Sequence, residues 1–157
     1  MIKKNKTEIV VVLDNIRSMH NIGAIFRTCD ALGSCSIILC GICAQPPNKD
    51  IHKTALGSTK SVNWSYYKQT IDAINYLKNK KFDIISVEQT NNSISLDTFK
   101  NKATKIALVF GNEVNGISSE IIKESTKSIE INQFGIKKSM NVSVVAGITI
   151  WTILNRV

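Results

Sequence analysis

The fold is indicated most directly by the stretch Glu8 to Asp14, which contains the run Ile9-Val10-Val11-Val12-Leu13. A strand with one solvated face alternates apolar and polar residues, because successive side chains point to opposite faces. This run does not alternate, so it is typical of a strand that is covered on both faces. A parallel sheet between two layers of helices provides that environment.

Outward from this stretch, strands and helices alternate along the chain. Further strands are predicted at residues 36–40, 62–67, 82–87, 105–110 and 128–131. Helices are predicted at residues 71–77, 117–125 and 23–32, where Ile25, Phe26 and Cys29 recur at helical spacing and Gly33 ends the segment. Residues 41–60 are expected to form a surface connection. This order predicts an α/β fold, a mostly parallel sheet with helices on both faces.

The final segment, residues 139–157, carries conflicting signals. Its valines and isoleucines favour a strand, but Ser139 can cap a helix and the segment is longer than a usual strand. We therefore predict a helix. It is apolar on nearly every side, which is unusual for the last helix of a small monomer. Either one face meets a second subunit, or the helix is buried completely within one chain.

The length of 157 residues, of which 43% are hydrophobic, is sufficient for one domain with its own core. No uninterrupted apolar run reaches the roughly 20 residues that cross a bilayer. The first residues also lack the apolar stretch of a signal peptide. We therefore expect a cytoplasmic protein without a membrane partner.

The net charge of +8 favours a polyanionic partner such as nucleic acid, because lysine and arginine release counterions from phosphates. Seventeen of the twenty basic residues are lysines, so compositional bias also accounts for part of this charge. Arg17 and Arg27 are more specific, because a planar guanidinium group recognises phosphate better than an ammonium group does. Ordinary solvated arginines remain the alternative.

Several ligand motifs can be set aside. The spacing of Cys40 and Cys43 resembles half of a zinc site, but no second pair of ligands appears near His20 or His52. We expect no metal, and reduced thiols in the core. A dinucleotide-binding glycine motif is missing after the first strand, and Gly111 to Gly116 lacks the lysine of a phosphate loop. The sequence contains no nucleophile motif of a hydrolase either.

Three remaining segments form an ordered pattern. They are Asn21-Ile22-Gly23-Ala24-Ile25-Phe26-Arg27, then Val109-Phe110-Gly111-Asn112-Glu113-Val114-Asn115-Gly116, then Ile131 with Ser139-Met140-Asn141-Val142-Ser143-Val144. In residue types, order and spacing they resemble the three motifs of the SpoU, or TrmH-like, family within the SPOUT superfamily of RNA 2′-O-ribose methyltransferases. The resemblance extends from about residue 9 to residue 154, and residues 63–104 contribute least.

The resemblance implies transfer of a methyl group from S-adenosylmethionine to a ribose 2′-hydroxyl of RNA. It also implies a C-terminal trefoil knot and a homodimer with the site beside the subunit junction. Many relatives carry an additional RNA-binding domain, whereas residues 1–157 are expected to form a single catalytic domain without one. Small members of the family often modify tRNA, so we expect tRNA rather than rRNA.

The resemblance also assigns roles residue by residue. Arg27 would orient the RNA and stabilise a forming alkoxide from a position about one turn inside the first helix. Asn21 would hold the loop or Arg27, and Glu113 would anchor the site by accepting hydrogen bonds. Ser139 and Asn141, at the start of the last helix, would arrange the catalytic centre.

The cofactor would be held near a second group of residues. The adenosine part is expected beside the backbone of Gly111, Ile131 and Met140, with Val87 and Glu88 as weaker candidates. Met140 departs from the leucine that is usual at this position, which is a mild change.

Each assignment has a structural alternative. The asparagines could be turn formers, Ser139 only a helix cap, and Glu113 a solvated loop charge. A non-catalytic RNA-binding or assembly factor with the same fold is the main functional alternative, and a flavodoxin-like nucleotide-binding domain is another. Without a separate RNA-binding domain, RNA contacts are expected from the lysines of the domain itself, namely Lys3, Lys4, Lys49, Lys53, Lys60, Lys137 and Lys138.

Overall fold

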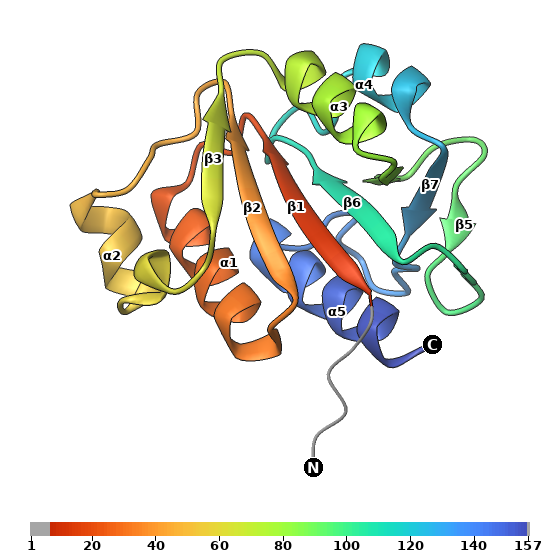
Figure 1. Ribbon diagram of the computed structural model, residues 1–157. Coiled ribbons are helices and arrows are strands. Elements are labelled where there is room, and N and C mark those ends of the chain that lie inside the picture. The colour runs from red at the N-terminus through yellow and green to blue at the C-terminus, as the bar shows by residue number, and fades with distance from the viewer. Residues whose placement is uncertain (1–6, 157) are drawn as a thin grey trace.

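A computed structural model describes residues 7–156 of the chain (Figure 1). Its strands form one seven-stranded sheet in the order β3-β2-β1-β6-β4-β7-β5, and every pair of neighbours is parallel. The strands are β1 (Glu8–Asp14), β2 (Cys35–Cys40), β3 (Trp64–Tyr67), β4 (Asp83–Val87), β5 (Ile94–Ser95), β6 (Lys105–Phe110) and β7 (Lys127–Glu130). The predicted α/β class is therefore confirmed.

Helices cover both faces of the sheet (Figure 1). One face carries α1 (Met19–Leu32), α2 (Lys49–Ala55) and α5 (Val142–Asn155), and the other carries α3 (Thr70–Asn79) and α4 (Ser119–Glu124). A short 3₁₀ turn, η1 (Ser58–Lys60), follows α2. Among the described residues, no helix combines the length and the apolar character that a membrane crossing requires.

The unbroken apolar run of β1 is explained by these two layers. Ile9, Val11 and Leu13 belong to the core under α1 and α5, whereas Val10 and Val12 belong to the core under α3 and α4. Alternate side chains of one strand thus enter different cores, and both cores require apolar residues. The strand is central, paired with β2 on one side and β6 on the other.

Some boundaries differ from the sequence prediction. Helix α1 begins at Met19 rather than Gly23, because the Ser18 hydroxyl caps it by accepting a hydrogen bond from the Asn21 N–H at 3.2 Å. The predicted connection at residues 41–60 contains α2 and η1. The last helix begins at Val142, so Ser139 is not its cap.

The four cysteines are free; Cys29, Cys40 and Cys43 are buried in the core as predicted, whereas Cys35 is half-buried. Desolvation by burial raises the pKa of Cys40 to about 12. The Cys43 thiol lies within 3.2 Å of the Ile16 N–H, from which it accepts, and within 3.3 Å of the Leu13 carbonyl, to which it donates. This thiol therefore supports the backbone where the chain leaves β1.

Parallel pairing places the carboxyl ends of all the strands at one edge of the sheet. Asp14, Phe110, Val87 and Glu130 end β1, β6, β4 and β7, and the polar segments that follow them are therefore brought together. The chain also reverses its direction of travel across the sheet between β1 and β6, where α/β sheets commonly open a crevice. Both features place a site at this edge.

Helices α1 and α2 pack closely at Gly23, where a Cβ atom would overlap Oγ1 of Thr54 and the carbonyl oxygen of Ile51. We predict that Gly23→Ala lowers the free energy of unfolding by about 1–3 kcal/mol, because the two helices must separate. Gly147 of α5 is the matched control, since a Cβ there would lie 3.8 Å from Cγ2 of Thr28. Gly147→Ala should leave the stability unchanged or raise it by up to about 1 kcal/mol. Urea denaturation of both variants tests this, and equal losses would contradict it.

Candidate active site

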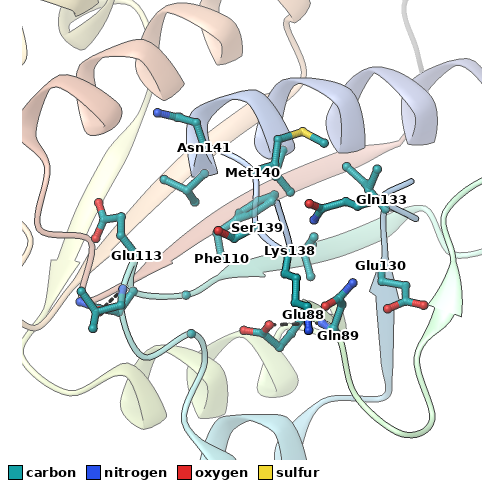
Figure 2. A pocket seen from close by; sticks show the side chains of 18 of the residues that line it. Glu88, Gln89, Phe110, Glu113, Glu130, Gln133, Lys138, Ser139, Met140 and Asn141 are labelled. Carbon is teal, nitrogen blue, oxygen red and sulfur yellow. Dashed lines mark hydrogen bonds between the residues drawn. The ribbon is translucent and has the colours of Figure 1, made fainter. Parts of the chain in front are cut away.

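A cavity of about 500 Å³ opens at the carboxyl edge of the sheet. Its wall is built from the segments that follow β4, β6 and β7 and from the start of α5 (Figure 2). Glu113 and Asn141 lie toward one end of this cavity, and Glu130 and Gln133 lie toward the other (Figure 2). Every residue that the sequence nominated for the site lines this cavity except Arg27, namely Asn21, Val87, Glu88, Gly111, Glu113, Ile131, Ser139, Met140 and Asn141.

The loop after β6 is folded by Asn112. Its Oδ1 accepts hydrogen bonds from the N–H groups of Val114 at 2.9 Å and Asn115 at 3.1 Å. Its backbone pairs with Gly116 in both directions, and its Nδ2 donates to the Asn15 carbonyl at 2.7 Å. Asn112 is therefore the turn former of this loop, and it ties the loop to the end of β1.

Gly111 and Gly116 are required by the tightness of the same loop. A Cβ atom on Gly111 would overlap the backbone of Gly116 and Ile117. Gly116 has a φ of 66°, in the left-handed region that glycine adopts without strain. Gly111 and Gly116 thus allow the tight turn of a loop that lines the cavity.

Glu113 connects this loop to the segment before α1. Its carboxylate accepts hydrogen bonds from the N–H groups of Arg17 at 3.0 Å and Ser18 at 3.1 Å, and from Nδ2 of Asn21 at 3.4 Å. Partial burial raises the pKa of Glu113, but these donors and its own N–H outweigh burial and hold the pKa below its ordinary value. The carboxylate is thus kept ionised where it joins two of the predicted motifs.

Glu88 braces the other end of the loop. Its Oε2 accepts a hydrogen bond from the Ile117 N–H at 3.0 Å, and its Oε1 accepts one from the Gln89 N–H at 3.2 Å. The carboxylate also lies against Gly116, where a Cβ atom would collide with it. Glu88 therefore shapes the cavity wall through the backbone, and its direct contact with a cofactor stays a prediction.

The start of α5 forms another wall. Asn141, not Ser139, is the N-cap: its Oδ1 accepts from the Ser143 N–H at 2.8 Å and from the Ser143 hydroxyl at 2.6 Å. Capping of this kind stabilises a helix by about 1 kcal/mol. The Asn141 amide nitrogen is not used in the cap, and Ser139 and Met140 precede the cap at the cavity (Figure 2).

Arg27 lies apart from the cavity. Because α1 begins at Met19, this residue is in the third turn of the helix rather than one turn inside it. Its side chain is exposed, and among residues 7–156 its guanidinium group makes no hydrogen bond or ion pair. One chain alone therefore does not bring Arg27 to the other nominated residues.

Several lining residues were not nominated from the sequence. They are Gln89, Phe110, Asn112, Val114, Gly116, Glu130, Gln133, Lys138, Val142 and Val145. Most of them are neighbours in sequence of the nominated residues. Their position after the ends of predicted strands was the signal in the sequence that could have identified them. Their contribution depends on which side chains turn inward, which the sequence does not specify.

Comparison with known proteins agrees with this geometry. The model of the SpoU rRNA Methylase family matches residues 8–151, and the chain belongs to that family. It is 31% identical over 153 residues to the tRNA (guanosine(18)-2′-O)-methyltransferase of Aquifex aeolicus, covering 96% of this chain and 71% of that protein. It is 27% identical to the enzyme of the same name from Thermus thermophilus, covering 96% of this chain and 76% of that protein.

A solved structure is also similar. It is the AdoMet-bound rRNA methyltransferase from Sinorhizobium meliloti, with a TM-score of 0.87 and 26% identity. The superposition covers 97% of this chain but only 57% of that one, so the present chain corresponds to a little over half of the Sinorhizobium protein.

The Glu113 contacts predict a pH effect. A carboxyl group whose pKa is lowered by folding adds stability at pH values above its unfolded pKa, and this is lost as the pH falls through the folded pKa. We therefore expect the loop to detach from residues 17 and 18 below the ordinary titration range of glutamate. Amide chemical shifts and exchange rates of Arg17 and Ser18 between pH 3 and pH 7 measure this. Glu113→Gln should abolish the pH dependence, and an unchanged profile in that variant would contradict the assignment.

Proposed function

We propose that this chain is an S-adenosylmethionine-dependent methyltransferase that acts on a ribose 2′-hydroxyl of RNA, with tRNA preferred to rRNA. The observation that carries the proposal is the convergence of the first turn of α1, the β6 loop and the start of α5 on one cavity in a member of the SpoU family. The preference for tRNA is supported by the names of the Aquifex and Thermus relatives. The Sinorhizobium protein, which is named for rRNA, is the reason to test both RNAs.

The lining of the cavity fits S-adenosylmethionine. Val87, Phe110, Ile131 and Val145 provide apolar surface for an adenine ring, and the Gly111 backbone allows close approach. The carboxylates of Glu88, Glu113 and Glu130 favour a ligand with a sulfonium and an ammonium group, and Lys138 can meet its carboxylate. The bound cofactor supplies a methyl group that positive sulfur has already activated.

The protein then has to orient the ribose hydroxyl and stabilise negative charge on its oxygen. The ribose oxygen would take the methyl group that S-adenosylmethionine supplies, the cofactor would leave as a neutral thioether, and the hydroxyl proton would pass to solvent. Arg27 holds the RNA phosphate and stabilises the forming alkoxide, because a guanidinium group stays protonated and donates in a fork. Asn21, Glu113, Ser139 and Asn141 fix the surrounding backbone and hydrogen bonds.

In this proposal, Arg27 reaches the reacting ribose hydroxyl because two copies of the chain form a homodimer. The exposed side of α5 carries Val144, Ile148 and Trp151, with exposed fractions of 48%, 39% and 59%. Their spacing forms one apolar stripe along the helix, which association with a second copy would bury. Thr28, the neighbour of Arg27, lies against Gly147 beside this stripe, so association through α5 brings Arg27 to the subunit junction.

Three further features belong to the same proposal. The segment that leads into α5 is threaded as a trefoil knot, the chain works as a single catalytic domain, and the protein acts in the cytoplasm. The family supports the knot, and the four free cysteines support a reducing compartment such as the cytoplasm. Exposed Lys49, Lys53, Lys60, Lys137 and Lys138 are available for RNA phosphates, although Lys53 also pairs with Asp50 at 3.1 Å. The proposed contacts of Lys3 and Lys4 lie outside the described residues.

Removal of the guanidinium group should affect the reaction and not the cofactor. We predict that Arg27→Ala lowers methyl transfer to RNA by roughly 100-fold or more, the scale of losing one group that stabilises a forming oxyanion. Calorimetry should show unchanged affinity for S-adenosylmethionine. Arg27→Lys should recover only part of the rate, because an ammonium group lacks the fork. A tritiated-methyl assay on tRNA and on rRNA provides the rates, and full activity of Arg27→Ala would refute the role.

Disruption of the α5 stripe should separate the subunits. We predict that the wild-type chain sediments at twice its 17.4 kDa mass and that Trp151→Glu sediments as a monomer with little methyl transfer. The matched control is Tyr76→Glu, which places the same charge on an exposed aromatic position of α3, on the opposite face of the sheet. The control should remain dimeric and active. A monomeric wild-type chain with full activity would rule out the dimer.

A further inference from the structure

A second cavity, of about 430 Å³, lies at the same edge of the sheet but on the side of α3 and α4. It is lined by the ends of β1 and β2, by the segment from β3 into α3, and by the start of α4. Its volume falls within the range of small-molecule pockets, roughly 300–1,000 Å³. None of the residues assigned above to methyl transfer lines it.

The base of this cavity holds a buried carboxylate. Asp14 is 4% exposed, and its Oδ1 accepts hydrogen bonds from the Thr70 hydroxyl at 2.5 Å and from Nδ2 of Asn15 at 3.0 Å. Its Oδ2 has no hydrogen-bond donor among residues 7–156, and Asp14 forms no ion pair with them. Oδ2 is not one of the buried polar side-chain atoms that lack a partner, so it is open to the cavity and can accept a hydrogen bond from a ligand there. A hydrogen bond to a charged acceptor is stronger than one between neutral groups.

The walls restrict what that ligand can be. The lining carries the carboxylates of Asp14 and Glu120 and the ammonium group of Lys68, so a phosphate inside the cavity meets two repelling groups and one attracting group. A divalent cation would need several oxygen ligands, and the described residues contain no cluster of three acidic, histidine or cysteine side chains. Ile42, Ile71 and Tyr66 provide apolar and aromatic surface above the carboxylate, and Ile42 is 62% exposed. A planar, uncharged group with N–H donors on one edge satisfies these conditions.

The position of the cavity relates it to RNA. Asn15 lines the second cavity, where its side chain donates to Asp14 and accepts from the Ile42 N–H. Its carbonyl accepts from Asn112, a residue of the β6 loop that lines the first cavity. Its φ of 57° lies in the left-handed region, which asparagine adopts more readily than most residues other than glycine, and these contacts hold it there. Both cavities lie at the carboxyl edge of the sheet, so an RNA strand bound at the first cavity can extend to the second.

We propose that the second cavity is a subsite for a nucleobase of the RNA substrate that carries an exocyclic amino group, which donates to Oδ2 of Asp14. The inference rests on the proposed function for its substrate class. Guanine, adenine and cytosine carry such an amine. Uracil does not, and its single N–H lies between two carbonyl oxygens that the carboxylate repels. The aliphatic and aromatic wall contacts the face of the base, and Lys68 contacts its phosphate.

The test uses the full chain saturated with S-adenosylmethionine, so that nucleotides do not occupy the first cavity. Guanosine, adenosine, cytidine and uridine 5′-monophosphates are titrated while the amide signals of Gly41, Lys68 and Thr70 are followed by NMR. The three amino-bearing nucleotides should shift these signals, with affinity about tenfold higher than that of uridine 5′-monophosphate, the scale of one hydrogen bond to a charged group. Equal affinity for uridine, or no shift with any nucleotide, would overturn the proposal.

Two variants separate recognition from folding. Asp14→Asn should lose about tenfold in affinity for the amino-bearing nucleotides and become indifferent to the base. Ser118→Phe fills the cavity from its rim without removing a hydrogen bond, because the Ser118 side chain does not cap α4. It should abolish binding, whereas the control Ser65→Phe, at an exposed position outside the cavity, should not. If Asp14→Asn fails to fold, Ser118→Phe decides the result, and unaltered binding by that variant would refute the subsite.

Failure of the subsite is distinguishable from failure of the proposed function. Cofactor binding and methyl transfer to RNA are measured separately in the same variants. A chain that transfers methyl groups but shows no base-dependent shifts retains the function and loses the subsite. A chain that binds no S-adenosylmethionine loses the function, whatever the nucleotide titrations show.

Discussion

Strand β1 has no polar face, and the layered architecture follows from that constraint. Its odd and even positions enter two different cores, so helices must cover the sheet on both sides. When a helix that covers the sheet connects two strands, the connection is long enough for the strands to be parallel. Every pair of neighbouring strands is parallel here. Parallel pairing then places the polar strand ends together, which is why segments far apart in the sequence share one cavity.

The polar groups at this edge are held mainly by side-chain to backbone hydrogen bonds. Asn112 folds one loop, Glu88 and Glu113 fasten its two ends, and Asn15 connects it to β1. Backbone groups in such a crowded turn need partners, because an unsatisfied buried N–H or carbonyl is costly. The amide and carboxylate side chains of the motifs therefore stabilise the loop, in addition to any role in catalysis. Substitutions of Glu113 or Asn112 should consequently be interpreted with a measure of folding as well as of activity.

The sequence was most informative where the local pattern and the tertiary environment agree. The bounds of β1 and β6 were predicted correctly because buried apolar runs end sharply at polar residues. Helix α2 was missed because only Ile51 and Ala55 of its seven residues are buried, so it lacks a clear apolar period. The start of α1 was misplaced because Met19, His20 and Asn21 look like a loop, whereas the cap at Ser18 already begins the helix. The place of Arg27 could not be predicted, because it depends on that start.

Asn15 lines the cavity near α3, and its carbonyl accepts a hydrogen bond from Asn112, which lines the cavity near α5. This hydrogen bond links the two cavities. If a ligand in the cavity near α5 shifts the backbone at Asn15, the affinity of the cavity near α3 for its own ligand changes. Thermodynamic linkage then requires that a ligand near α3 change the affinity of the cavity near α5 by the same factor. The cofactor and the nucleobase in the second cavity would then influence each other's affinity without touching. The order in which they arrive would alter the kinetics of the encounter but leave the equilibrium of the ternary complex the same.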